Sequence, residues 1–173
     1  MNRLLSALVI TVTTSIAVAA VAEEFLPTPF TAEEIGNAWR PGYEMTMKIW
    51  TPDGETVSRT RVEGWSRQAI ETSEQPLDES GSPTGEKSVS SSSWEDLRDH
   101  ARFPAATTDR ERATRITTLG ELEGWLYTVR GEEGGISEFF FADDFPGPPV
   151  EFSQTDGDSV IFRAETIAVT PAP

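Results

Sequence analysis

Short alternating segments dominate the second half of the chain and constrain its fold more than any other feature. Five of them follow Ala113 in close succession, with Gly-rich or Pro-rich turns between them: ATRITT, ELEGWLYTVR, GISEFFFA, VEFSQT and SVIFRAETIAV. No stretch between these segments is long enough for an extended helix, so neighbouring strands are expected to pair antiparallel. The pattern predicts a mainly β fold, a curved antiparallel meander that forms a half-barrel or open barrel, with two short helices.

Three consecutive phenylalanines give the third of these segments two apolar faces. Alternation places Phe139 and Phe141 on one side of the sheet and Phe140 on the other. The aspartates at 143–144 mark the end of the strand. The segment Pro146–Pro149 that follows is a stiff loop with few free N–H donors, suited to folding over a sheet edge or the mouth of a barrel.

The last two segments form a hairpin whose register depends on the length of its loop. A two-residue loop would place charged Glu151 opposite Phe162. A three-residue loop over 156–158 instead gives the following pairs: Phe152 with Phe162, Val150 with Ala164, and Glu151 with Arg163. We predict the second register because both faces then contain chemically matched neighbours.

An earlier hairpin is predicted around a turn at Asp53-Gly54. Its outer face is charged and pairs Trp50 with Val57, Lys48 with Arg59, Thr46 with Arg61, and Glu44 with Glu63. Its inner face sets large residues of the first strand (Tyr43, Met45, Met47 and Ile49) against small residues of the second (Gly64, Val62, Thr60 and Ser58). The inner face is expected to be buried.

The first helix is predicted from Ala32 to about Trp39. Thr31 and Glu34 have the spacing of a capping box, and Phe30 with Ile35 forms the matching hydrophobic staple. One of the two helices is expected to plug the concave face of the sheet; the first helix either fills that face with Phe30, Ile35 and Trp39 or leaves a groove there.

The second helix follows two edge-like strands and a polar loop. One strand lies around Ile70, the loop runs from Pro76 to Gly85, and the four serines 90–93 complete the second strand. Ser93 is predicted to cap the helix, because Asp96 follows three residues later. Trp94, Leu97 and Ala101 recur at helical spacing, and Pro104 is expected to end the helix.

The N-terminal residues have the order of a secretory signal. Arg3 precedes an uncharged apolar stretch that ends in Ala20-Val21-Ala22, which predicts a signal peptide over 1–22 and one mature domain over 23–173. The apolar stretch is also near the roughly 20 residues of a bilayer span, so an uncleaved anchor is the alternative. We expect an exported protein, periplasmic or secreted, with no stable membrane span after cleavage.

Composition excludes several classes of function. The sequence contains no cysteine, so the domain has neither a disulfide nor a lipid-modified cysteine. Without Arg3, 13 basic side chains stand against 29 acidic ones, a formal charge of −16. Such a charge disfavours nucleic acid and anionic membranes as partners.

The order of these elements, with the late unit GELEGWLYTVR…EFFFADDFPGPPV, resembles the exported half-barrel proteins related to the lipoprotein carriers LolA and LolB. The resemblance implies an incomplete β-barrel around helices, with an apolar concavity for acyl chains or another hydrophobic partner. Because the chain has no cysteine to acylate, tethering to a membrane by that route is excluded.

These observations predict a non-enzymatic protein that needs no cofactor and binds a lipid or other apolar ligand on its concave face. The predicted ligand-binding residues are Tyr43, Met45, Met47, Ile49, Val62, Phe139 and Phe141. Met45 and Met47 favour such a site, because methionine is a soft side chain suited to a variable apolar ligand. A protein-interaction or structural module of the cell envelope is the alternative.

A hydrolase built on Asp143, Asp144 and His100 is the less favoured possibility. His100 is the only imidazole, and no serine or cysteine lies in a nucleophile motif. The acidic pairs 132–133, 143–144 and 156/158 do not have the spacing of a calcium loop, so no metal site is predicted. Among the five tryptophans, Trp94 and Trp125 are expected in the core, and Trp50 is the best candidate for an exposed contact.

Overall fold

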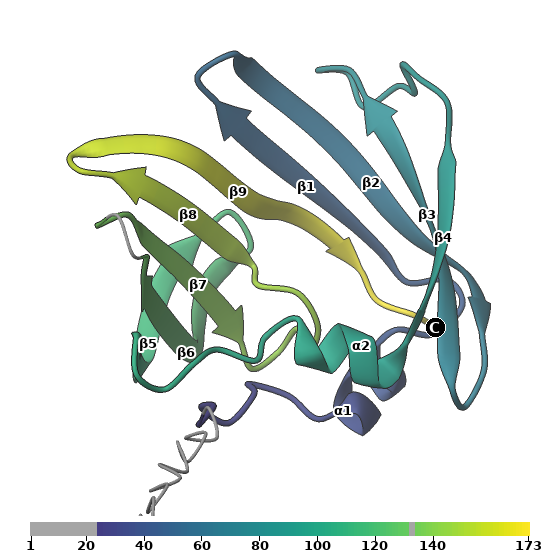
Figure 1. The fold of residues 1–173 in the computed structure, drawn as a ribbon. Coiled ribbons are helices and arrows are strands. Elements are labelled where there is room, and N and C mark those ends of the chain that lie inside the picture. Colours follow the sequence, from purple (N-terminus) through teal and green to yellow (C-terminus); the bar gives the residue numbers. More distant parts are fainter. Residues whose placement is uncertain (1–23, 132–133) are drawn as a thin grey trace, which may run out of the picture.

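A computed structural model describes residues 24–131 and 134–173 and shows one curved antiparallel sheet (Figure 1). Its nine strands lie in the order β4-β3-β2-β1-β9-β8-β7-β6-β5, and β4 and β5 are its two edges, so the sheet is not closed. The predicted curved meander is confirmed. The predicted signal peptide and the acidic pair 132–133 lie outside the described residues. The strands are β1 (Glu44–Thr51), β2 (Gly54–Trp65), β3 (Ala69–Leu77), β4 (Ser88–Ser93), β5 (Thr108–Thr117), β6 (Gly120–Arg130), β7 (Ile136–Ala142), β8 (Glu151–Asp156) and β9 (Ser159–Thr170).

Two short helices, α1 (Ala32–Ala38) and α2 (Trp94–Asp99), contact each other and lie across one end of the concave side of the sheet (Figure 1). The predicted capping box of α1 is present: the Glu34 N–H donates to the Thr31 hydroxyl at 3.2 Å, and the Thr31 N–H donates to the Glu34 carboxylate at 2.8 Å. Ser93 caps α2 by accepting from the Asp96 N–H at 3.0 Å. The second helix ends at Asp99, well before Pro104.

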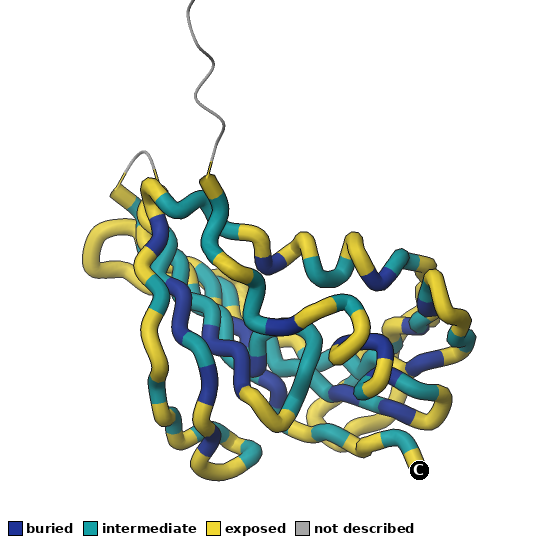
Figure 2. The backbone as a smooth tube through the Cα atoms, turned by 90° about the horizontal axis from the view of Figure 1, so that it is seen from below, coloured by how far each residue is buried: buried dark blue, intermediate teal, exposed yellow. Residues whose placement is uncertain are grey.

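The buried residues form two clusters, one on each face of the sheet, and Figure 2 marks the buried positions along the backbone in dark blue. The concave cluster joins α1 and α2 to the sheet and contains Phe30, Ile35, Trp39, Tyr43, Met45, Val62, Ile70, Trp94, Ala101, Tyr127 and Phe141. The convex cluster consists of Leu122, Leu126, Phe140, Ala142 and Val150. The predicted division of the three phenylalanines between two faces is confirmed, because Phe139 packs against the concave cluster beside Phe141.

The first hairpin has its predicted faces, but its register differs by two residues. Trp50 pairs with Glu55 rather than with Val57, and Thr51 pairs with Gly54, so the turn is Pro52-Asp53. Proline suits the first central position of a turn because its ring fixes φ. Gly54 opens β2 with φ +139°, a value that favours glycine.

The last hairpin also differs by two residues from the predicted register. Phe152 pairs with Ala164 and Gln154 with Phe162, and the turn contains two residues, not three. A bulge between Gln154 and Thr155 changes the pairing, which lets a two-residue turn coexist with the correct faces. As a result Glu151 lies opposite Glu165 rather than Arg163.

These two opposed carboxylates on the convex face have pKa values shifted in opposite directions. Burial raises the pKa of Glu151, although Arg115 lies 3.6 Å away and opposes the shift. Burial would also raise the pKa of Glu165, but hydrogen bonds from the hydroxyl and N–H of Thr118 lower it overall.

Replacing each carboxylate with glutamine is therefore expected to change stability with opposite sign. A raised native pKa means that Glu151 loses stability as the pH rises through that pKa, so Glu151→Gln should raise Tm at pH 7. A lowered native pKa means that Glu165 contributes stability above pH 4.5 and loses it as the pH falls, so Glu165→Gln should lower Tm at pH 7. Thermal melts between pH 3 and pH 7 test both, and shifts of the same sign at neutral pH would contradict this assignment.

Candidate functional site

A groove of about 410 Å³ remains open on the concave side, between α2, the sheet and the loop at 147–149. We call it the concave groove. Its apolar walls come from Ile35, Trp39, Ile70, Leu97, Ala101, Phe139 and Phe141, its polar positions from Thr60, Thr72, Ser90, Ser92 and His100, and its loop wall from Gly147, Pro148 and Pro149.

Indole hydrogen bonds attach the two helices to the sheet and fix the helical side of the groove. The Trp65 N–H donates to the Gly36 carbonyl at 3.0 Å, and the Trp94 N–H donates to the Ser66 carbonyl at 3.0 Å. A Cβ at Gly36 would lie 3.4 Å from the Trp94 ring, so α1 packs closely on that indole. The two indoles lie behind the groove lining and hold α1 and α2 in place, and their N–H groups are satisfied by backbone carbonyls.

The loop wall is attached to α1 by Trp39. Its ring stacks on Tyr43 with 4.7 Å between centroids, and its N–H donates to the Pro146 carbonyl at 2.9 Å. The next residue, Gly147, has φ +146°, and a Cβ there would lie 2.6 Å from the Trp39 nitrogen. Glycine is required at this close approach, which holds Pro148 and Pro149 against the groove.

Small polar side chains form the sheet wall near the β4 edge. Ser90 pairs with Thr72 and Ser92 with Ile70, so these residues share the concave face. The Ser90 and Thr72 hydroxyls lie 3.3 Å apart. Short side chains leave the groove open where larger ones would fill it. The alternation of serine along β4 carried this signal, but it also suits an ordinary edge strand.

The seven predicted ligand-binding residues lie on the concave side in two situations. Phe139 and Phe141 line the groove. The other five belong to β1 and β2 and the residue before them: Tyr43, Met45 and Val62 are buried in the cluster that α1 covers, Met47 packs against it, and Ile49 is half-buried. The first helix thus fills part of the concave face, and the groove lies beside the filled part.

Burial controls the titration of the two tyrosines near the groove. It raises the pKa of Tyr43 to about 12 and raises that of Tyr127 as well. The Tyr127 hydroxyl accepts from Arg110 at 2.8 Å and donates to the Pro27 carbonyl at 2.6 Å, which attaches the segment before α1 to β6. Both phenols stay neutral at physiological pH and serve as packing groups.

The three residues of the possible hydrolase do not share one site. His100 is the exposed C-cap of α2 and lines the groove. Its backbone N–H donates to the Asp96 carbonyl at 3.1 Å. Asp143 forms two hydrogen bonds with Arg112, and Asp144 lines a different hollow beside Phe145. Within residues 24–131 and 134–173, no three His, Cys, Asp or Glu side chains are grouped to hold a metal ion.

No family model and no curated protein matches the sequence. The fold is similar to two solved structures. One is a chain in the structure of the Pseudomonas aeruginosa MucA/MucB complex, with a TM-score of 0.54 and 12% identity over 76% of this chain. The other is a crystal structure of MucB, with a TM-score of 0.55 and 12% identity over 82% of this chain.

These likenesses show a shared curved β fold. The chain spans just over half the length of the solved chains, covering 52% and 57% of them. Among the described residues, no helix is long and apolar enough to cross a membrane.

Proposed function

We propose that this chain is an exported, non-enzymatic binding domain that holds the apolar part of a ligand in the concave groove. The observation that carries the proposal is the groove itself, which stays open beside the part of the concave face that α1 fills. Its volume lies within the range of about 300–1,000 Å³ typical of small-molecule sites, and its walls are mostly apolar with a few polar positions. The resemblance to the LolA and LolB carriers supports an acyl chain as the guest.

An envelope protein is the second candidate partner, and two observations favour it. The fold neighbour MucB is found in a complex with MucA. The groove also reaches β4, an edge strand whose outer backbone groups meet no neighbouring strand in the described part of the chain. An extended segment of a partner protein can pair with such an edge and place alternate side chains in adjacent pockets.

A matched pair of variants on β4 tests the groove. Ser90→Trp is expected to place an indole in the groove and to weaken binding of a fluorescent fatty acid at least tenfold. Ser91→Trp adds the same ring to the opposite face of the same strand and should leave the affinity unchanged, because successive strand residues alternate between faces. Fluorescence titration of both variants and the parent gives the comparison.

Native mass spectrometry of protein purified from its own host separates the two partners. Co-purifying lipid that is lost in Ser90→Trp supports the carrier. A protein that is free of lipid and ignores the fatty-acid probe, but retains an envelope protein, supports the interaction module. Hydrolysis of an ester or glycoside that disappears in His100→Ala would contradict the non-enzymatic proposal altogether.

A further inference from the structure

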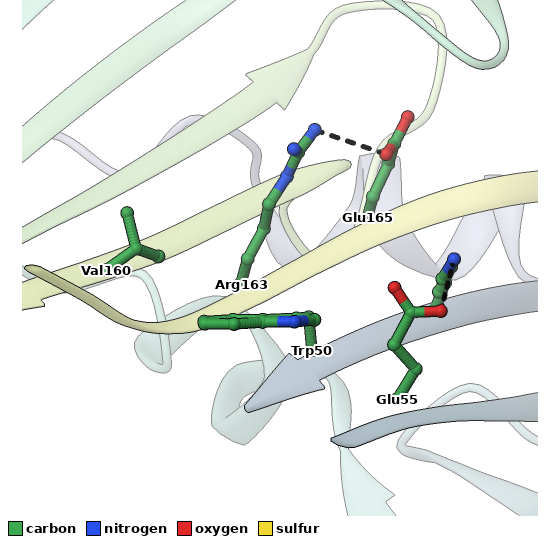
Figure 3. A pocket seen from close by; sticks show the side chains of 6 residues that line it. Trp50, Glu55, Val160, Arg163 and Glu165 are labelled. Carbon is green, nitrogen blue, oxygen red and sulfur yellow. Dashed lines mark hydrogen bonds and ion pairs between the residues drawn. The ribbon is translucent and has the colours of Figure 1, made fainter. Parts of the chain in front are cut away.

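A second hollow, of about 370 Å³, lies on the convex face, away from the concave groove. We call it the Trp50 hollow. Figure 3 shows the side chains that line it, from β1, β2 and β9: Lys48, Trp50, Glu55, Val160, Arg163 and Glu165. Trp50 is 36% exposed, so much of the indole is accessible.

Strand pairing fixes the positions of these side chains. Trp50 pairs with Glu55 on β2 and with Arg163 on β9, so a charged side chain flanks the ring on each side. Two residues along the strand and on the same face, Lys48 pairs with Glu165. The hollow is therefore set on paired central strands of the sheet, near the turns that join β1 to β2 and β8 to β9.

The charges of the hollow balance one another. Lys48 contacts Glu55 at 2.7 Å, and Arg163 contacts Glu165 at 3.3 Å (Figure 3). The hollow carries no net charge, although the chain as a whole has a formal charge of −15. A small cation or anion would gain little attraction there, because each charge is already paired with one of opposite sign.

A neutral ligand with an apolar face and many hydroxyl groups fits this arrangement. The ammonium and guanidinium groups donate hydrogen bonds and the two carboxylates accept them, so both roles of a hydroxyl group can be satisfied. Hydrogen bonds with charged partners are stronger than neutral ones. The flat indole offers an apolar surface for the C–H face of a sugar ring.

We propose that the Trp50 hollow binds a neutral carbohydrate, with one sugar ring stacked on Trp50 and its hydroxyl groups hydrogen-bonded to the flanking charged side chains. This site is separate from the concave groove and does not depend on what the groove binds. It gives the domain a second surface, so that a ligand in the groove and a glycan on the convex face can be held at the same time.

Two-dimensional ¹H–¹⁵N NMR of the full chain tests this directly through the indole N–H signals. The indoles of Trp39, Trp65 and Trp94 donate to backbone carbonyls, whereas that of Trp50 meets no acceptor within the described part of the chain. Titration with chitotetraose and with maltotetraose is expected to move the Trp50 signal, assigned by its loss in Trp50→Phe. The three bonded indole signals should remain in place.

Variants and added salt distinguish binding of a neutral sugar at Trp50 from ionic binding or binding elsewhere. Trp50→Ala should weaken binding of the active sugar at least tenfold, measured by shifts of the backbone signals of Arg163 and Glu55. Val89→Ala, at an apolar position on β4 that is more exposed than Trp50, should leave it unchanged. Binding that persists at high salt supports a neutral ligand. If neither sugar moves the Trp50 signal, or if only tetramethylammonium does so and salt abolishes its effect, the proposal is overturned.

Discussion

Replacing Gly124 with alanine is expected to lower the free energy of unfolding by more than about 4 kcal/mol, a large fraction of the about 5–15 kcal/mol that stabilises an ordinary domain. Gly124 lies in the middle of β6, where it pairs with Ala142 on β7 and with Ala113 on β5. A Cβ added there would lie 2.0 Å from the Phe141 carbonyl oxygen and 2.8 Å from the Ala142 Cα. Both atoms belong to the backbone, so no side-chain rotation can relieve the clash.

The position of Gly124 explains the size of the effect. Its strand contributes Leu122 and Leu126 to the convex cluster and Tyr127 to the concave one, so displacement of β6 from β7 disturbs both cores. Gly85→Ala is the control, because a Cβ there meets Pro76 at 3.4 Å, an ordinary contact. Urea unfolding followed by tryptophan fluorescence compares the two. A Gly124→Ala protein as stable as Gly85→Ala would show that β6 and β7 approach less closely.

Sequence alternation predicted the faces of the sheet correctly because side chains of a strand point to opposite sides in turn. Both hairpins kept their predicted faces even though their registers differed by two residues. A shift of two preserves the face of every residue, whereas a shift of one would reverse it. The exact pairs depended on the turn at Pro52-Asp53 and on the bulge after Gln154, which hydrophobic patterning does not encode.

The groove was only partly predictable for a different reason. Capping signals located both helices, and the phenylalanine pattern identified Phe139 and Phe141 as concave residues. How far α1 extends over the concave face depends on contacts between distant segments, such as the bond from Trp39 to the Pro146 carbonyl. No periodicity near Tyr43 or Met45 indicates that α1 covers them and leaves the space beside Ser90 open.

Trp39→Ala is expected to lower the free energy of unfolding by about 3–5 kcal/mol, the usual cost of removing a large buried aromatic side chain. The ring is 6% exposed, so most of its surface is lost from the core. The substitution removes the stacking on Tyr43 and leaves the Pro146 carbonyl without its donor. It also removes the ring that packs against Gly147, so the loop wall of the groove loses its attachment to α1.

Trp39→Phe divides this effect into its parts. Phenylalanine retains an aromatic ring against Tyr43 but cannot donate to the Pro146 carbonyl. The loss in free energy of unfolding that remains in Trp39→Phe therefore reflects the unpaired carbonyl and the smaller ring. About 1–3 kcal/mol is expected for the unpaired carbonyl. Hydrogen exchange at Val150, whose N–H donates to the Phe140 carbonyl at 2.8 Å, should accelerate in both variants if the bond from Trp39 holds the loop in place. Because that loop forms one wall of the groove, affinity for the fatty-acid probe should fall in Trp39→Phe even where the domain remains folded. Unchanged exchange and affinity in Trp39→Phe would instead show that the prolines hold the wall without help from α1.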